Sequence, residues 1–376
     1  MKITGIICEY NPFHAMHSAH IRLAREKTQA DYIVCALSGP FVQRGDLAIC
    51  DKWRRTKMAL LGGADAVFEL PVRFALGAAP DFARGGVTLL SALGADALCF
   101  GSENDDLALL EQAAQLQIDP TQGLKDGKSY PRALGEAAGA LSPWLSLPNF
   151  TLGVEYLRAI AAYAPHLQAA AVLRTGAHHA KTLDAFASAG AIRAGLFAGE
   201  TQRRQALAIL PDFSAALLPA KPLCLDDLNQ AVLYALRAMM PERMSAISGM
   251  REGLENRIFQ AAQVSRTLEE LFANVKCKRY TMAAIRRAVC AAALGMTKEL
   301  EKQTPTAPYA RLLGFRTGSA ALLKQIKQRT QIPILTKIAD APPNDCLLLD
   351  MRAQDLADLA ACQPIRRDLT TSPVRV

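Results

Sequence analysis

His14 and His17 are the side chains in this sequence best placed to do chemistry. They follow an apolar run that ends at Asn11-Pro12, where the pattern turns helical. Residues three apart share one face of a helix, and the first helical turn favours an anion because its N–H groups are free and its dipole end is positive. The pair therefore predicts a site for nucleotide phosphates; two capping or surface histidines without a ligand are the alternative. His20 lies one turn deeper, where a structural role is favoured.

The elements around this loop predict a sheet that presents it to a ligand. Apolar runs alternate with helix candidates at 18–29, 52–61, 82–93, 106–116 and 151–162; the runs cover 3–9, 32–37, 66–70, 97–100 and 170–173. The runs lack a two-residue alternation, which predicts burial on both faces. We therefore expect an α/β fold with a doubly wound parallel sheet. Ligands of such sheets bind beyond the carboxyl ends of the strands, where the histidine loop falls.

The second half of the chain has a different pattern. From about residue 196 onward, segments such as 226–239, 251–272 and 281–294 carry helical periodicity and little β-branching. One further strand is predicted at 332–336, before a closing helix near 350–361. We therefore predict an α/β domain that holds the phosphate site over 1–195 and a mainly helical, basic region over 196–376.

Composition limits the class of protein. Of 376 residues, 51% are hydrophobic and 21% charged, which excludes wholesale disorder. The longest uncharged run, 137–154, is broken by prolines, so no membrane span is expected, and the first apolar stretch is too short for a secretory leader. We expect a cytoplasmic protein. The nine cysteines form no Cys-x-x-Cys pair, which favours buried free thiols over a disulfide framework or a metal site.

The positive charge is unevenly distributed. The net charge is +8, and the segment 271–290 contains five basic residues and no acidic one between Leu271 and Cys290. Such a patch suits a phosphate backbone, and a solvated basic face is the alternative. Two further basic segments, 43–46 and 52–55, fall near the carboxyl edge. The candidate contacts to nucleic acid are Arg44, Lys52, Lys276, Lys278, Arg279, Arg286 and Arg287.

Several motifs together resemble a known family. The stretches 9–14, 38–45, 51–59, 100–103, 148–156, 252–257 and 312–315 resemble those of the tRNA(Met) cytidine acetate ligases, and 14–17 resembles the His-x-Gly-His signature of the nucleotidyltransferase superfamily. The resemblance implies that ATP activates acetate as acetyl-adenylate with release of pyrophosphate. It implies that the acetyl group then passes to N4 of the wobble cytidine in elongator tRNA(Met). Mg²⁺ is compatible with this chemistry, although no carboxylate pair is predicted to hold it.

The resemblance also implies the site residues. His14 and His17 are the catalytic candidates, and Ser188 with Arg193 resembles a second signature that grips the β- and γ-phosphates. From the residues alone, a strand-end turn is favoured for Gly101, and helix capping is a strong alternative for Asn149. For Arg174, a phosphate or adenylate contact is favoured over a surface ion pair. The full set of ATP contacts that the resemblance implies, which makes 1–195 an ATP-binding domain of the nucleotidyltransferase type, is Ile7, Cys8, Glu9, Tyr10, Asn11, Pro12, Phe13, His14, Ala15, Met16, His17, Ser18, Ala19, His20, Gly101, Asn149, Arg174, Ser188 and Arg193.

One residue departs from the signature. Met16 stands where the pattern has glycine, and a glycine lets a nucleotide approach bare backbone. Either the Met16 side chain folds away or the ATP site is altered. Two other functions stay open. One is a small-molecule adenylyl- or cytidylyltransferase, which leaves the basic second half without a task; the other is an RNA-binding protein that has lost catalysis.

Overall fold

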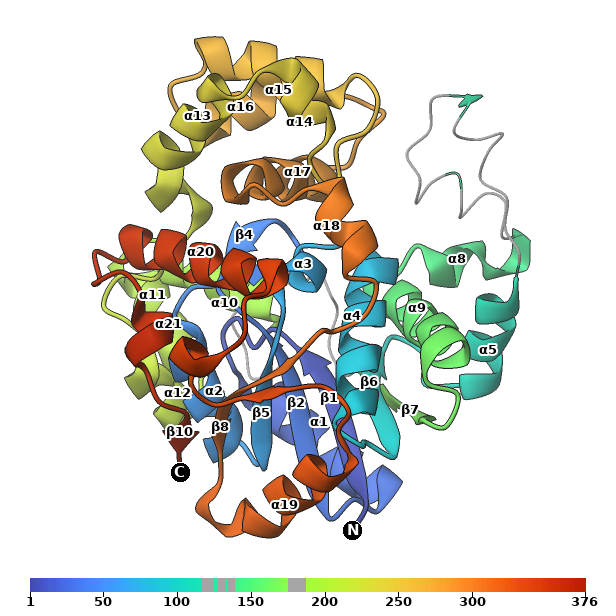
Figure 1. Cartoon of the computed structure of the whole chain (residues 1–376). Coiled ribbons are helices and arrows are strands. Elements are labelled where there is room, and N and C mark those ends of the chain that lie inside the picture. The colour runs from blue at the N-terminus through green and yellow to red at the C-terminus, as the bar shows by residue number, and fades with distance from the viewer. Residues whose placement is uncertain (117–124, 127–132, 134–138, 175–186) are drawn as a thin grey trace.

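The computed structural model describes residues 1–116, 125–126, 133, 139–174 and 187–376. A mostly parallel sheet forms its centre, with strand order β10-β8-β5-β2-β1-β6-β7 and β9 beside β8 (Figure 1). The strands from β5 to β7 are parallel, whereas β8 runs antiparallel to β5. Their bounds are β1 (Ile3–Cys8), β2 (Tyr32–Ser38), β5 (Ala66–Leu70), β6 (Ala97–Ser102), β7 (Gln168–Leu173), β8 (Ala310–Phe315), β9 (Ile334–Leu335) and β10 (Val374–Arg375).

Helices cover both faces of this sheet, which confirms the doubly wound prediction. Val34 and Ala36 of β2 lie in a core with α4 and α9, whereas Ile33 and Cys35 lie in a second core with α1 and α2. Because both faces are buried, the strands have no polar side and the sequence shows no alternation. The helices are α1 (Ala15–Thr28), α2 (Lys52–Leu61), α3 (Val72–Ala75), α4 (Ala79–Ala92), α5 (Leu107–Gln115), α8 (Ser142–Leu145) and α9 (Pro148–Tyr163).

The second half is mainly helical. The helices between residues 229 and 294 pack around one core, which the helix at 345–360 joins and which also takes in Phe41, Leu47, Val72 and Leu76 from the first half. The helices are α10 (Ala189–Phe197), α11 (Glu200–Ala208), α12 (Asp212–Leu217), α13 (Asn229–Ala238), α14 (Pro241–Ser245), α15 (Leu254–Val264), α16 (Leu268–Val275), α17 (Met282–Leu294), α18 (Lys298–Gln303), α19 (Ala320–Arg329), α20 (Asp345–Ala360) and α21 (Arg367–Thr370). No helix in the described part of the chain has the length and apolarity needed to cross a membrane.

The last part of the chain returns to the sheet. The predicted strand at 332–336 is present as the two-residue β9, but β8 and β10 extend the sheet and were not predicted. β8 contains Arg311, whose charge interrupts the apolar run by which the other strands were predicted. The division at residue 195 stays a prediction, to which the structure adds that the second half contributes strands to the sheet of the first.

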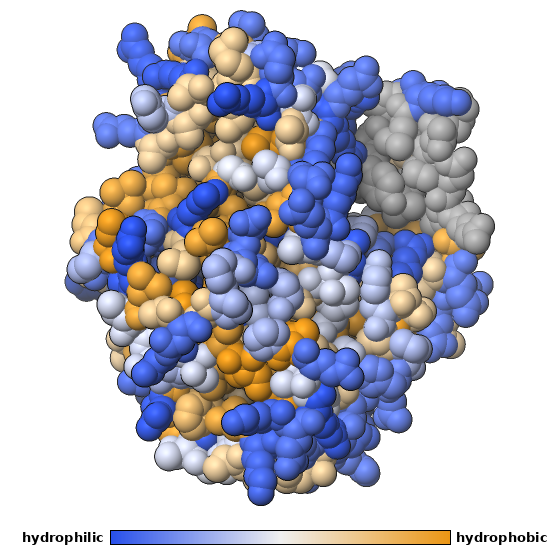
Figure 2. Space-filling model, viewed as in Figure 1, coloured by the Kyte–Doolittle hydropathy of each residue, from blue (hydrophilic) through white to orange (hydrophobic). Residues whose placement is uncertain are grey.

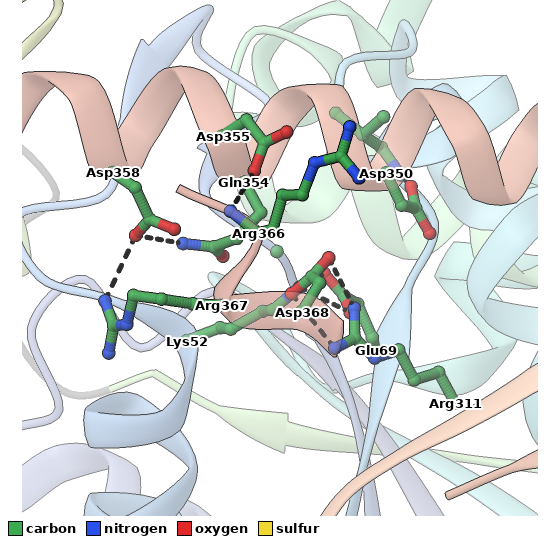
Figure 3. A network of polar contacts seen from close by, with 12 residues as sticks. Lys52, Glu69, Arg311, Asp350, Gln354, Asp355, Asp358, Arg366, Arg367 and Asp368 are labelled. Atoms are coloured by element: carbon green, nitrogen blue, oxygen red, sulfur yellow. Dashed lines mark hydrogen bonds and ion pairs between the residues drawn. The ribbon is translucent and has the colours of Figure 1, made fainter. Parts of the chain in front are cut away.

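A buried network of charges joins this returning segment to the sheet (Figure 3). Lys52 Nζ lies 2.8 Å from Glu69 Oε1 and 2.9 Å from Asp368 Oδ1, and Arg311 Nη1 bridges the same two carboxylates at 2.9 and 2.8 Å. All four side chains are buried. The prediction that Lys52 contacts tRNA is therefore wrong: its ammonium group is enclosed and paired, so it has no face to offer a phosphate.

Candidate nucleotide site

The two histidines sit where β1 gives way to α1. His14 is the N-cap residue of α1, and its backbone N–H donates to His17 Nδ1 at 3.2 Å. The two rings stack with centroids 3.7 Å apart and planes inclined by 24°. Since Nδ1 of His17 accepts a hydrogen bond, the proton of the neutral ring is on Nε2. The spacing of three residues thus places His14 and His17 in a fixed stacked pair, in which Nε2–H of His17 is free to donate a hydrogen bond.

Both histidines are held neutral. Burial lowers the pKa of His14 to about 4, with the nearby Arg174 and Arg193 adding to the effect. Burial also lowers the pKa of His17 well below its usual value, and His14 contributes to that shift. The pKa of His20 falls to about 4, again through burial. At pH 7 the imidazoles therefore act as hydrogen-bonding groups, and the two arginines supply the positive charge.

The loop before the helix is fixed by its own polar groups. Asn11 Oδ1 accepts from the N–H of Ile49 at 2.9 Å, and Glu9 Oε1 accepts from the N–H of Gln43 at 2.7 Å. Arg55 is fully buried and donates to the carbonyl of Glu9 at 2.8 Å. The side chains of Glu9 and Asn11 are thus occupied in holding neighbouring loops, which pre-organises the histidine loop for a ligand.

Some of the residues that the resemblance implies as ATP contacts have buried side chains. Tyr10 and Phe13 are buried beneath the loop, and a Cβ added to Gly62 would lie 2.2 Å from Phe13 Cζ. Cys8 is also buried. These residues support the loop from the core side. Met16 is partly exposed in the first turn of α1, so its side chain is not folded into the core.

The second signature lies against the first. Ser188 caps α10, its Oγ accepting from the N–H of Ala191 at 3.1 Å. One turn later, Arg193 Nη1 donates to the carbonyl of Asn11 at 2.6 Å. Residues 182 positions apart in the sequence thus meet at one loop. The guanidinium lies close enough to His14 to depress its pKa.

A third group of residues lies at the ends of β6 and β7. Arg174 Nη1 lies 3.3 Å from Asn149 Oδ1, and Asn149 Nδ2 donates to Glu103 Oε1 at 2.7 Å. A Cβ added to Gly101 would lie 3.1 Å from Arg174 Cγ, so the glycine makes room for the arginine stem. Gly101, Asn149 and Arg174, which the sequence suggested separately, therefore lie in contact with one another. Arg174 also acts on His14, because its positive charge helps to lower the pKa of that histidine.

Glu103 is the residue that sequence reasoning missed in this group. It accepts from the N–H of Asn149 at 3.2 Å and from the N–H of Phe150 at 2.6 Å, so it caps α9 from a distant position in the chain. The cap role suggested for Asn149 is filled instead by Leu147 at the N-cap position and by this carboxylate. Glu103 falls in the stretch 100–103 that carries the resemblance, which is the signal that could have found it.

The basic candidates divide into two sets. Arg286 pairs with Asp46 at 2.8 Å, and Arg287 donates to the carbonyl of Gln43 at 3.1 Å, so both hold the hairpin of β3 (Phe41–Val42) and β4 (Asp46–Leu47) against α17. A Cβ on Gly45 would lie 2.5 Å from the Arg287 nitrogen, which shows how closely the two elements pack. The exposed candidates are Arg44, Lys276, Lys278 and Arg279.

Comparison with known proteins matches these observations. A family model described as HIGH Nucleotidyl Transferase matches residues 1–371. The tRNA(Met) cytidine acetate ligase of Clostridium perfringens is 33% identical, over 100% of this chain and 99% of its own; that of Clostridium kluyveri is 36% identical, over 94% and 93%.

Solved structures agree with the sequence relatives. The crystal structure of Thermotoga maritima TmcAL in its apo form superposes with a TM-score of 0.92 at 29% identity, and the form bound with alpha-thio ATP gives 0.90 at the same identity. Both alignments cover 100% of each chain. Together with a sheet that ends in the histidine loop, these matches show that the chain belongs to the tRNA(Met) cytidine acetate ligase family of HIGH nucleotidyltransferases.

Proposed function

We propose that this protein is an ATP-dependent ligase that acetylates N4 of the wobble cytidine in elongator tRNA(Met). The observation that carries the proposal is the convergence of the stacked pair His14 and His17, the start of α1, and the guanidinium groups of Arg174 and Arg193. Neutral donors and two fixed cations at a helix N-terminus are suited to a triphosphate. The Thermotoga maritima structure bound with alpha-thio ATP supports ATP as the ligand.

In the first step, a carboxylate oxygen of acetate attacks the α-phosphorus of ATP. The bond between that phosphorus and the bridging oxygen to the β-phosphate breaks, and acetyl-adenylate and pyrophosphate form. Charge develops on the phosphate oxygens during this exchange. The His17 Nε2–H and the guanidinium groups of Arg174 and Arg193 are placed to stabilise that charge, which is the main catalytic contribution such a site makes.

In the second step, the N4 amine of the cytidine attacks the carbonyl carbon of acetyl-adenylate. A C–N bond forms, the bond to the AMP oxygen breaks, and one amine proton is lost. AMP leaves as an anion, which the same donors suit. Among residues that the structure describes, no group of three His, Cys, Asp or Glu side chains is arranged to hold a metal ion.

The adenosine part of ATP is assigned to the group at the ends of β6 and β7. Asn149 and Arg174 border this edge, and Glu103 fixes the asparagine through two hydrogen bonds. Glu103 accepts from the backbone N–H groups of Asn149 and Phe150 in the first turn of α9. The position of the Asn149 side chain is therefore fixed by its place in this helix. This supports Asn149 as a pre-positioned contact for the nucleoside.

The RNA is assigned to the exposed basic residues of the hairpin tip and of the segment after α16. Arg44 lies near Arg193 and helps to depress its pKa, so the basic surface begins at the nucleotide site. Lys276, Lys278 and Arg279 continue it on the helical half. Contacts of this kind with phosphates make affinity fall steeply with salt. An unstacked anticodon base is needed to present N4.

The direct test is mass analysis of elongator tRNA(Met) after incubation with protein, ATP and isotopically labelled acetate. We expect a single labelled acetyl group on the wobble cytidine, and none on the same tRNA with uridine at that position. Pyrophosphate exchange that ignores acetate and requires a phosphorylated metabolite would instead identify a small-molecule transferase. Salt-sensitive tRNA binding without ATP turnover would identify a non-catalytic RNA-binding protein.

A further inference from the structure

A cavity of about 540 Å³ lies between α2, the C-terminal part of α20 and the segment that joins α12 to α13. It contains no residue of the histidine loop, and neither Gly101, Asn149 nor Arg174 lines it. Its volume falls within the range of sites for small molecules. Figure 2 shows apolar surface over α20, which carries the exposed Leu348 and Leu359. The proposed reaction gives this cavity no task.

The cavity combines an apolar wall with positive charge. Trp53, Leu223 and Ala357 contribute apolar surface. Four cationic side chains and two carboxylates line the same space; they are Arg54, Lys57, Lys221, Arg367, Asp51 and Asp358. Arg54 and Arg367 pair with these two carboxylates, and Lys221 pairs with Asp227, so Lys57 is the cation in excess. Lys57 is exposed and forms no hydrogen bond or ion pair with any residue the structure describes. A flat apolar molecule that carries an anionic group matches this lining.

Two buried acceptors at the cavity lack partners. Gln354 Oε1 and Asp358 Oδ2 are both without a hydrogen bond, although each residue is only 1% exposed. Their other polar atoms are satisfied: Gln354 Nε2 and Arg367 Nη1 both donate to Asp358 Oδ1, at 2.9 and 3.1 Å (Figure 3). A buried acceptor without a donor is costly. A ligand that brings N–H groups to this wall would remove the cost.

We propose that this cavity is a second nucleotide site. The base lies against the apolar wall with its amino groups toward Gln354 and Asp358, and the phosphate lies beside Lys57, the cation of this lining that has no carboxylate partner among the described residues. Free mononucleotides and a nucleotide of a single RNA strand share this chemistry. Binding of a nucleotide that belongs to an RNA strand rests on the proposed function, whereas binding of a free mononucleotide does not.

The cavity and the histidine loop share a wall. Ala48 and Cys50 line the cavity, while the N–H of Ile49 between them holds Asn11 Oδ1. The carbonyl of Cys50 also accepts from Arg55 Nε at 3.2 Å, and that guanidinium holds the carbonyl of residue 9. A ligand in the cavity therefore touches the same short segment that fixes the proposed ATP loop.

Calorimetric titration of the full protein tests the site. The titrants are 5′-CMP and a single-stranded RNA trinucleotide, each added in the presence of a saturating non-hydrolysable ATP analogue. We expect binding that weakens about tenfold in Lys57→Glu, which removes one phosphate contact and adds a repelling charge. Lys327→Glu makes the same charge change at an exposed residue of α19 and should leave binding unchanged.

A second variant tests the apolar wall. Ala357→Trp fills the cavity and should abolish binding of both titrants, and thermal unfolding of the variant shows whether it folds. Equal affinity for 5′-CMP and the trinucleotide identifies a free nucleotide as the occupant; much tighter trinucleotide binding identifies RNA. The proposal is overturned if neither titrant binds, or if Lys57→Glu binds as the wild type does. The acetylation assay is independent of both results, so failure here leaves the proposed function standing.

Discussion

Two polar clusters lie near the carboxyl edge of the sheet, and they differ in how completely their groups are paired. In the cluster of Lys52, Glu69, Arg311 and Asp368, two cations meet two carboxylates and no ammonium or guanidinium faces solvent. In the histidine site, two arginines stand beside neutral imidazoles, and His14 Nδ1 has no partner. The first cluster is complete without a ligand, whereas the second has hydrogen-bonding capacity left over. Both clusters contain charged side chains, so what distinguishes the binding site from the structural cluster is whether its polar groups already have partners.

Removing Lys52 should cause the largest loss of stability. Lys52→Ala leaves Glu69 and Asp368 with one cation fewer in a buried position, and breaking a buried pair in this way costs about 3–5 kcal/mol of unfolding free energy. Denaturant titration measures the loss. Lys57→Ala on the exposed face of the same helix is the matched control and should change stability by less than about 0.5 kcal/mol. Equal effects of the two variants would show that the buried cluster is not structural.

His17 should show the opposite balance, with a large loss of activity and a smaller loss of stability than Lys52→Ala. His17→Ala removes the Nε2–H donor, and loss of one such donor lowers kcat by about 10²–10³-fold. The measurement is acetate-dependent pyrophosphate exchange, with denaturant titration in parallel. His166→Ala, at a histidine outside the site, is the control. Normal kcat in His17→Ala would remove this residue from the catalytic group.

The buried network should also respond to pH through Asp350. Burial raises the pKa of this carboxyl to about 7, with Glu69 adding to the shift. The folded state then keeps a proton that the unfolded state has lost above about pH 4, so this contribution is complete below pH 4 and disappears as pH rises through about 7. Unfolding free energy should fall by about 2 kcal/mol from pH 5 to pH 7.

The histidines act in the other direction, since their lowered pKa values favour the folded state at higher pH. The contribution of Asp350 is therefore read as the difference between the wild type and Asp350→Asn. The variant retains an oxygen that can accept from the N–H of Val72, which the carboxylate binds at 2.7 Å. Parallel stability curves for the two proteins from pH 5 to pH 7 would contradict the prediction.

Glu103 lies in the nucleotide site, but its carboxylate is fully engaged in hydrogen bonds, as in the buried cluster. Glu103→Gln keeps one acceptor but loses the charge-assisted bonds to Asn149 and Phe150, so we expect about tenfold weaker ATP binding. The Kd for ATP and the KM against kcat measure this: a positioning role raises KM and leaves kcat nearly unchanged. Glu111→Gln, on an exposed position of α5, should have no effect. An unchanged Kd in Glu103→Gln would contradict the role.

Met16 should give the smallest effect. Replacing this partly exposed side chain with glycine opens space at the start of α1, so Met16→Gly should leave ATP binding unchanged or improve it. The Kd for ATP is the measurement, and Glu26→Gly, at an exposed position of the same helix outside the implied ATP contacts, controls for the loss of helix propensity, about 1 kcal/mol. A large loss of affinity in Met16→Gly alone would mean that the nucleotide does not lie along this turn.

The sequence was informative where function depends on local spacing. His14 and His17 reach one face of α1 because three residues make nearly one helical turn, and Ser188 caps α10 as a short polar side chain before a helix does. These features need no distant partner. The same reasoning failed at Lys52, because a basic residue at a helix start has the same local pattern whether solvent or a buried carboxylate faces it.

The amino-acid sequence by itself determined the buried parallel strands and the histidine loop, since periodicity and turn residues act over a few positions. Only the tertiary structure decided which charges are paired. Arg311 reaches Glu69 across 242 positions, and Arg193 reaches Asn11 across 182. Such contacts depend on the strand order and on the return of the chain to the sheet. The physical reason is that a charge is stabilised by what surrounds it in space, and the neighbours in sequence do not specify that environment.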